Sequence, residues 1–210
     1  MGIVHELGQK VTLPRMVKIH QKFDATQIDD IYMAAMYELD QEKIRSTIRP
    51  GMHIAITGSS RGIDRQRDLL RAIVDFVKRQ GGKPFIIPAM GSHGGATVEG
   101  QRRILESYGI TEAYCGCPIM ATMETKKICQ LPDGHDVLID RYAAEADGII
   151  VFGRVKLHSH FRGRYESGIM KMMTIGLGKQ HGAESAHDTG IAHLAEVIET
   201  FGNAVRTHAN

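Results

Sequence analysis

The stretch ITGSSRGID, residues 56–64, joins an apolar run to a pattern typical of an amphipathic helix. The run before it, MHIAIT (52–57), has the composition of a buried strand, and residues 64–80 carry apolar side chains at helical spacing. A glycine-rich turn between a strand and a helix is typical of folds in which crossover helices connect parallel strands. The sequence therefore predicts a three-layer α/β domain with a mainly parallel central sheet and a Rossmann-like arrangement.

The same alternation continues along the chain. We expect strands at 16–23, 52–57, 83–88, 135–140 and 147–155, and helices at 24–48, 64–80, 97–108 and 187–206. For the helix at 24–48 an early break stays open. Thr97 is a typical N-cap for the third of these helices, and Gly109 a typical end. No internal repeat or linker interrupts the pattern, which predicts a single α/β domain over residues 1–210.

The turn at 56–64 looks like the T-G-x-x-x-G-x-G fingerprint of short-chain dehydrogenases, but other residues argue against a dinucleotide cofactor. Asp64 stands where the last glycine is expected, and its side chain and charge oppose close packing and a pyrophosphate. The strand PFIIP (84–88) ends without the acidic residue that binds a ribose. The chain also has no Tyr-x-x-x-Lys pair. The turn therefore requires another function.

Composition narrows the class of protein. A chain of 210 residues with 42% hydrophobic content can bury one substantial core. The formal net charge is +2, and no apolar stretch reaches the roughly 18 residues of a membrane-spanning helix, so we expect neither a nucleic-acid nor a membrane partner. Three cysteines, an odd number, and the lack of a secretory signal pattern predict reduced thiols and a cytoplasmic location.

Two glycine-rich stretches hold most of the chemically useful side chains. PAMGSHGGAT (88–97) follows a predicted strand and carries His93. RVKLHSHFRGRYESGIMKMMTIGLGKQHGAESAH (154–187) follows another and carries His158, His160, His187 and Lys171. Because the carboxyl ends of parallel strands share one sheet edge, where open α/β sheets bind ligands, we expect His93, His158 and His160 at a common site.

Clustered histidines near a lysine support two chemistries. Opposed imidazoles can exchange a proton on two faces of one carbon, because they titrate near neutrality. Neutral imidazole is also a common ligand of nickel, zinc and copper. The residues alone leave open a noncatalytic phosphate- or nucleotide-binding module that uses the turns at 94–95 and 167–168. A zinc hydrolase built on His158, His160 and His187 ranks last, because no glutamate is placed as its base.

Four motifs in this order, PAMGSHGGAT, RVKLHSHFRG, ESGIMKM and IGLGKQHGAESAH, together with ITGSSRGI, resemble the N-terminal domain of the nickel-dependent lactate racemase family. They are most similar to members that racemise or epimerise other 2-hydroxy acids. The resemblance implies an isomerase that transfers the α-hydride of its substrate reversibly to a nickel-pincer nucleotide, a pyridinium mononucleotide whose sulfur and carbon atoms hold nickel. It implies cofactor-biosynthesis enzymes and the family's C-terminal domain, which lies outside these 210 residues, as partners, and it leaves a homodimer open.

The resemblance also assigns the substrate-side residues. Arg61 matches the arginine that binds the substrate carboxylate, and His93 matches the first of two acid/base histidines. The second is His158 or His160, with His158 narrowly favoured because it follows a strand and a Lys-x pair.

The cofactor-side residues follow in the same way. Lys171 matches the lysine that can attach the cofactor, Ser167 and Gly168 match the turn near the cofactor phosphate, and His187 matches the nickel ligand. The chain departs from the family's prototype at 58–60, where Gly-Ser-Ser replaces an acidic residue, and in its ESGIMK helix start. Lactate itself is therefore not the expected substrate, and covalent or noncovalent attachment of the cofactor stays open.

Overall fold

The computed structural model describes residues 8–9, 11, 14–188, 190 and 193–209, with side chains for all of these except residues 187 and 188. The strands in this part are β1 (His53–Gly58), β2 (Lys83–Pro88), β3 (Thr125–Gln130), β4 (Asp136–Asp140) and β5 (Gly148–Ile150). The helices are α2 (Ile31–Leu39), α3 (Glu42–Arg45), α4 (Gln66–Arg79), α5 (Val98–Ser107), α6 (Glu112–Cys115), α7 (Arg141–Glu145), α8 (Gly168–Lys171), α9 (Lys179–Asp188) and α10 (Leu194–His208). A 3-10 turn, Gly94–Ala96, precedes α5, and a π-helical turn, Met172–Gly176, follows α8.

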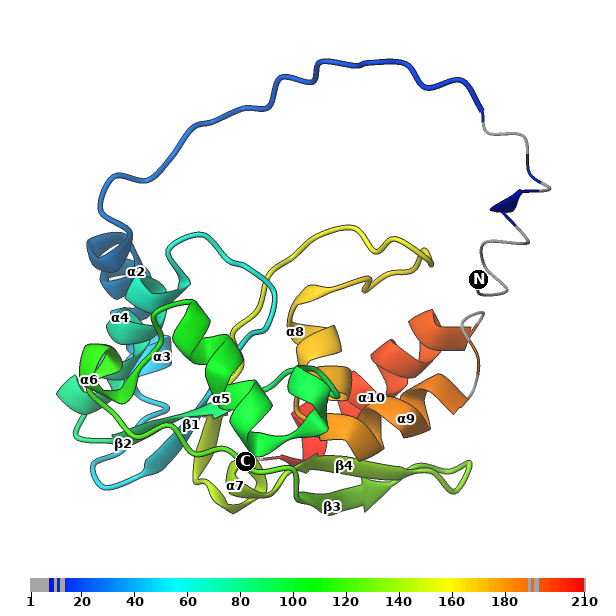
Figure 1. Ribbon diagram of the computed structural model, residues 1–210. Coiled ribbons are helices and arrows are strands. Elements are labelled where there is room, and N and C mark those ends of the chain that lie inside the picture. The colour runs from blue at the N-terminus through cyan, green and yellow to red at the C-terminus, as the bar shows by residue number, and fades with distance from the viewer. Residues whose placement is uncertain (1–7, 10, 12–13, 189, 191–192, 210) are drawn as a thin grey trace.

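β1 lies at the centre of a three-stranded parallel sheet, between β2 and β5. Its successive residues point to opposite faces, so that Ile54 and Ile56 join one core cluster and Ala55 joins the other. Both faces are buried, which explains the continuous apolar run in the sequence. Helices cover both faces (Figure 1), so the predicted α/β class with a parallel central sheet is confirmed. The strand order β2-β1-β5 does not confirm the Rossmann-like arrangement.

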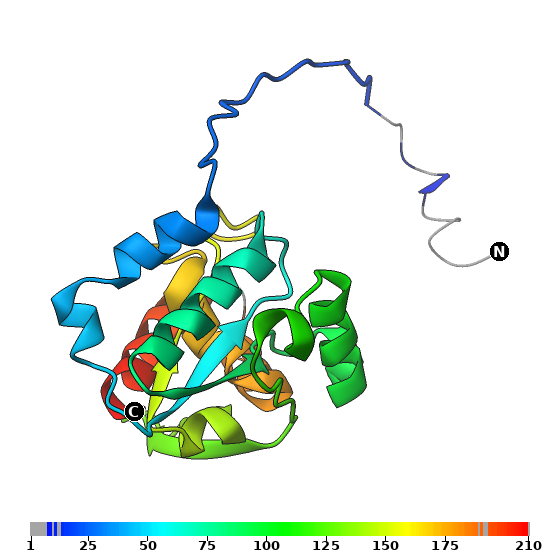
Figure 2. The same ribbon diagram turned by 90° about the vertical axis from the view of Figure 1, so that its left-hand side faces the viewer.

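Two hydrophobic clusters join the layers, one on each face of the sheet. On the first face, Ile56 and Ile86 pack with Leu70 and Val74 of α4 and with Leu105 of α5. The second cluster is built from β4, α7, the π-helical turn, α9 and α10. Figures 1 and 2 show α2 and α4 on one side of the sheet and α8, α9 and α10 on the other.

The first two crossover helices agree with the sequence pattern. The apolar stripe of α4 is buried, and the helix spans residues 66–79 of the predicted 64–80. Thr97 caps α5 as predicted, because its hydroxyl oxygen accepts the N–H of Gly100 at 3.0 Å. Both helices begin shortly after the loops that follow β1 and β2, so they fix the outgoing ends of those loops.

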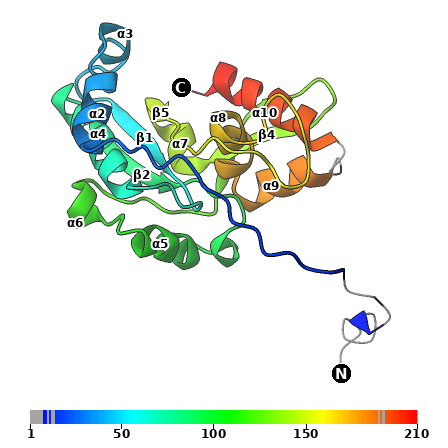
Figure 3. The same ribbon diagram turned by 90° about the horizontal axis from the view of Figure 1, so that it is seen from above.

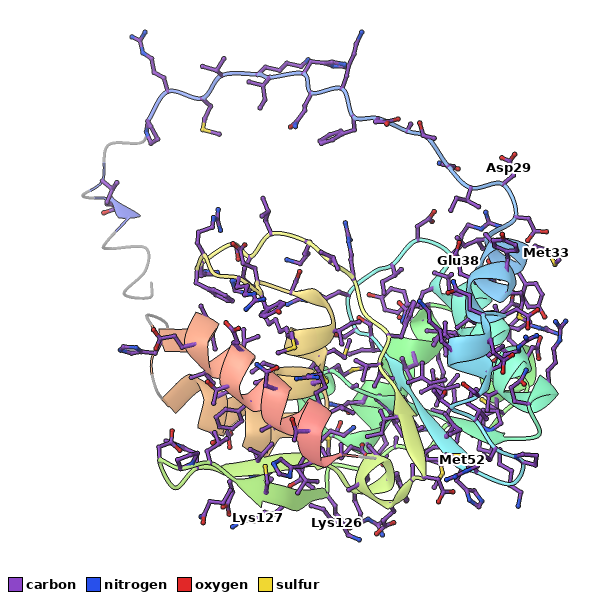
Figure 4. All side chains as sticks on the ribbon, turned by 180° about the vertical axis from the view of Figure 1, so that it is seen from behind. Asp29, Met33, Glu38, Met52, Lys126 and Lys127 are labelled. Atoms are coloured by element: carbon purple, nitrogen blue, oxygen red, sulfur yellow. The ribbon has the colours of Figure 1, made fainter. Side chains whose placement is uncertain are left out.

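The strand predicted at 16–23 is absent. These residues form part of an extended arm that projects from the body (Figures 1 and 3), and Met16 and Phe23 are 90% and 76% exposed. Figure 4 shows side chains standing out on both sides of the arm. The alternating apolar pattern of this segment is typical of a strand, but a strand requires hydrogen bonds from a neighbouring strand.

Other elements differ from the prediction in their partners or bounds. The strand at 136–140 is present as β4, but it pairs antiparallel with β3 in a second sheet. β3 is not predicted from sequence, since Lys126 and Lys127, labelled in Figure 4, interrupt its apolar pattern. The helix predicted over 24–48, with an early break left open, begins only at Ile31 and consists of two shorter helices, α2 and α3. The helix predicted to begin at 187 begins at Leu194, because the chain up to Asp188 belongs to α9.

β5 is shorter than the predicted strand at 147–155, and the chain continues from it into a long loop. None of the helices in the described part of the chain is long and apolar enough to cross a membrane.

A buried ion pair connects the second core cluster to the end of β2. Lys179 and Asp140 are both fully buried, and Lys179 Nζ lies 2.9 Å from Asp140 Oδ2. Lys179 also donates hydrogen bonds to the carbonyl oxygen of Pro88 and, at 3.2 Å, to Gln101 Oε1. Asp140 Oδ1 in turn accepts the N–H groups of Tyr142 and Ala143 at the start of α7. One lysine thus joins β2, α5 and the β4–α7 junction.

Replacing Lys179 tests this connection. Lys179→Met leaves the Asp140 carboxylate buried without its counter-charge, so we expect it to lower the free energy of unfolding by about 3 to 5 kcal/mol in urea titrations. Adding Asp140→Asn to that variant should recover part of the loss, because the unpaired charge is removed. The control is Lys126→Met, which breaks an ion pair with Glu145 that is about half exposed and should change little. Equal effects of the two lysine substitutions would contradict this role for Lys179.

Candidate functional site

The three parallel strands end at one edge of the sheet, and the loops that follow them enclose a pocket of about 460 Å³. The loops are residues 59–65 after β1, 89–97 after β2 and 151–167 after β5. Thr57 joins the first and third at their origin, because its hydroxyl accepts the N–H of Phe152 at 2.7 Å and donates to the carbonyl of Phe152 at 3.1 Å. The pocket therefore lies where open α/β sheets place ligands.

Six of the eight predicted site residues line this pocket: Arg61, His93, His158, Ser167, Gly168 and Lys171. His160 is not among the lining residues, and its ring centroid lies 5.8 Å from that of His158. The backbone of His187 belongs to α9, but its side chain lies outside the described part of the structure. The lining favours His158 over His160, and the role of each residue stays a prediction.

The ring of His93 connects the loops after β1 and β2. Its Nδ1 lies 2.5 Å from the Ser60 hydroxyl oxygen. The loop itself is held by Gln101, whose Nε2 donates to the carbonyls of Gly91 at 2.9 Å and His93 at 3.3 Å. Because a serine hydroxyl can donate to Nδ1 or accept from it, His93 can keep this bond with its proton on either nitrogen. That freedom suits a residue that must gain and lose a proton.

His158 is held differently. Its Nδ1 accepts the backbone N–H of His160 at 3.2 Å, and its ring packs on Phe161 with centroids 4.3 Å apart. Its own N–H donates to the Glu166 carboxylate at 2.8 Å. An Nδ1 that accepts a backbone N–H carries no proton, so neutral His158 carries its proton on Nε2. The two histidines therefore enter the pocket with different constraints on their tautomers.

Burial and nearby cations lower the pKa of both histidines. For His93, burial lowers the pKa below its ordinary value, followed by the charges of Arg61 and Lys171. For His158, burial again has the largest effect, followed by Lys171 and Lys156. Burial and the charges of Lys156 and Arg61 lower the pKa of Lys171 as well. The pocket thus favours neutral imidazoles and a more nucleophilic lysine.

Lys171 lines the pocket from the end of α8. Its Nζ lies 5.8 Å above the centroid of the Phe161 ring, close enough for a cation–π contact. The π-helical turn begins at the next residue, and its members Met172, Ile175 and Gly176 also line the pocket. Such turns are frequent at functional sites because the extra residue reorients side chains within a helix.

Ser167 and Gly168 are tied to the extended stretch that leaves β5. The Ser167 hydroxyl accepts the N–H of Lys156 at 2.6 Å and donates to the carbonyl of the same residue. The N–H of Gly168 donates to the carbonyl of Arg154 at 3.1 Å. Ser167 and Gly168 both line the pocket. The amide of Gly168, which the sequence suggests as a donor to a phosphate, is however already bonded to the carbonyl of Arg154.

Some residues that shape the site are not predicted from sequence. Ser60 stands beside Arg61 in the turn of residues 56–64, but nothing in the pattern indicates its contact with His93. Gln101 carries a signal, because it lies four residues before Leu105 and so on the buried face of α5. The sequence gives no signal for the buried position of Lys179, since a lysine that follows Gly-Leu-Gly is typical of the surface. Among the described residues, no three His, Cys, Asp or Glu side chains are grouped as a metal site.

Comparison with known proteins gives one family match. A family model described as the lactate racemase N-terminal domain matches residues 9–198. The match includes all three loops of the pocket and ends within α10. No curated protein matches the chain.

The charge of the pocket predicts a pattern of histidine titration. Removing a nearby cation stabilises the imidazolium, so Lys171→Met should raise the pKa of both histidines, measured by NMR of the ring nitrogens. Arg61→Gln should raise the pKa of His93 alone, and Lys156→Gln that of His158 alone.

The control is Arg164→Gln on the same loop, which should change neither pKa because Arg164 pairs with Glu199 at 3.2 Å, outside the pocket lining. Since each histidine binds a proton less tightly in the folded than in the unfolded chain, protonation favours unfolding. The stability that both contribute is lost as the pH falls below the ordinary histidine pKa of 6.5. Equal pKa shifts of His93 and His158 in all four variants would contradict this assignment of neighbouring cations.

Proposed function

We propose, because the chain belongs to the lactate racemase N-terminal domain family, that its pocket binds a nickel-pincer nucleotide and racemises or epimerises a 2-hydroxy acid. One observation carries the proposal: three loops, far apart in sequence, and the helix α8 that follows the third bring two histidines, an arginine and a lysine to one pocket. These are the groups required to bind a carboxylate, exchange a proton and attach a cofactor.

The residues present fit an anionic nucleotide. Among the described residues, the pocket lining contains four cationic side chains and no carboxylate. Lys171, with its lowered pKa, would attach or contact the cofactor, and Ser167 and Gly168 would lie near its phosphate. His187 would be the protein ligand of nickel. A metal held mainly by the cofactor's own atoms does not require a cluster of three protein ligands. When bound, the cofactor would accept and return the α-hydride of the substrate.

The chain's own residues would control the substrate and its proton. Arg61 would bind the carboxylate in a charge-assisted pair, which fixes the α-carbon relative to both histidines. His93 would take the hydroxyl proton on one face, with Ser60 satisfying its Nδ1 in either protonation state. His158 would act on the opposite face. A C-terminal domain would close over the pocket and exclude water.

The three cysteines bear on the cellular location of the protein. Cys115, Cys117 and Cys129 are free, and burial raises the pKa of Cys117 to about 12, so this thiol stays protonated and unreactive. Free thiols support a cytoplasmic location, where cofactor-biosynthesis enzymes would supply the nickel-pincer nucleotide.

Nickel analysis tests the cofactor assignment. We expect near-stoichiometric nickel in chain coexpressed with nickel-pincer biosynthesis enzymes, and loss of nickel in His187→Ala. The matched control is His181→Ala, on the same helix, which should retain nickel because His181 is exposed beside Glu184. An added covalent mass that disappears in Lys171→Met would show attachment at Lys171. Wild-type protein that binds phosphate but takes up no nickel would contradict the racemase and favour a noncatalytic binding module.

Racemisation assays test the acid/base pair. Polarimetry on 2-hydroxy acids should show losses of about 10²- to 10⁴-fold in kcat for His93→Asn and for His158→Asn, the range typical of a missing acid/base group. His160→Asn should lose far less, because His160 does not line the pocket. A large loss in His160→Asn with little in His158→Asn would reverse the assignment of the second histidine.

A further inference from the structure

The chain that leaves β5 alternates between the pocket and solvent. Arg154, Lys156 and His158 line the pocket, whereas Val155 and Leu157 between them are 84% and 74% exposed. Residues two apart on an extended backbone point to the same side. The backbone geometry that delivers His158 to the pocket therefore delivers two cations as well.

This stretch is fixed in place at both of its cationic residues. The backbone of Lys156 is bonded to the Ser167 hydroxyl, and the carbonyl of Arg154 accepts the N–H of Gly168. Arg154 Nη1 also donates to the carbonyl of Gly62 at 2.9 Å, which anchors the guanidinium at the loop that carries Arg61. A guanidinium has five N–H donors, so this bond leaves most of them for a ligand.

The positive charge of the pocket lining is not balanced by a carboxylate of the described lining residues. In the described part of the chain, no carboxylate lines the pocket or forms an ion pair with any of its four cations, which are Arg61, Arg154, Lys156 and Lys171. The two arginines of the same loop that do not line the pocket are paired, Arg162 with Glu166 at 3.7 Å and Arg164 with Glu199 at 3.2 Å. An anionic ligand would supply the missing charge.

We propose that Arg154 and Lys156 form a second anion subsite, which binds a carboxylate or phosphate group in addition to the carboxylate assigned to Arg61. The inference rests on the proposed function. A 2-hydroxy monocarboxylate has one negative charge, which Arg61 pairs. It leaves Arg154 and Lys156 without an anionic partner, since their side chains are bonded to the backbone carbonyls of Gly62 and Leu157. A 2-hydroxy acid with a second acidic group pairs them. The phosphate of the cofactor is the other source of the same chemistry.

Anion binding to the cofactor-free chain tests the subsite. Binding is followed by NMR titration with three probes: lactate, its dicarboxylate analogue malate, and inorganic phosphate. We expect wild-type chain to bind malate about tenfold more tightly than lactate, as one additional charge-assisted contact allows. The difference should disappear in the double variant Arg154→Gln/Lys156→Gln. It should persist in Arg164→Gln, which removes a paired arginine of the same loop.

The probes separate the two sources of the anion. A preference for malate that the double variant loses assigns the subsite to a second acidic group of the substrate. Phosphate affinity that the double variant loses, without a preference for malate, assigns it to the cofactor phosphate. If the double variant keeps its wild-type affinities, or if wild-type chain binds neither malate nor phosphate, the subsite is overturned. Both replaced side chains are exposed, and equal urea midpoints will show that the double variant folds.

The readout requires neither nickel nor turnover. A chain that discriminates malate from lactate but never loads nickel would refute the racemase and keep the subsite. If the enzyme contains nickel and is active, but its anion affinities do not change in the double variant, the subsite is refuted and the racemase proposal stands.

Discussion

The buried ion pair between Lys179 and Asp140 is the interaction on which the candidate site depends. Removing two charges from water is costly, and the pair offsets this cost through its own attraction and through further hydrogen bonds. Lys179 donates to Pro88 and Gln101, and Asp140 Oδ1 accepts two N–H groups of α7. Through Gln101 the lysine is connected to the backbone of Gly91 and His93, and through Pro88 to the end of β2. The loop that carries His93 is therefore fixed by a residue that does not itself line the pocket.

The opposite wall of the pocket depends on a second connection. Thr57 binds both backbone groups of Phe152, so the chain after β5 leaves the sheet at a defined point beside the chain after β1. From there the extended backbone sets the side on which Arg154, Lys156 and His158 lie. Strand geometry thus positions the side chains of this wall, and the buried ion pair positions the loop that carries His93. The sequence predicts only the first of these, because the two-residue spacing of an extended chain is a local pattern.

The sequence predicts the parts of the fold that local patterns determine. β1, α4 and the capped start of α5 have strong apolar periodicity or a specific capping residue, and each appears as predicted. Residues 16–23 have the alternating apolar pattern of a strand but form none, whereas β3 is a strand although its sequence lacks that pattern. Both differences arise because a strand requires a neighbouring strand to pair with, and the local sequence does not show whether one is present. The gathering of six predicted residues at one pocket follows from the sheet-edge rule. The contact of Ser60 with His93 does not, because it depends on how two loops meet.

The bond between Thr57 and Phe152 spans 95 positions of the chain, and this separation has a consequence for biosynthesis. The ribosome releases β1 and β2 long before β5, so these two strands can pair while the second wall of the pocket is still being made. One wall, with Arg61 and His93, is then exposed until residues 150–171 emerge and close the other. Any ligand that requires both walls can bind only after residues 150–171 have left the ribosome. Loading with a cofactor would therefore follow the pairing of β5 with β1.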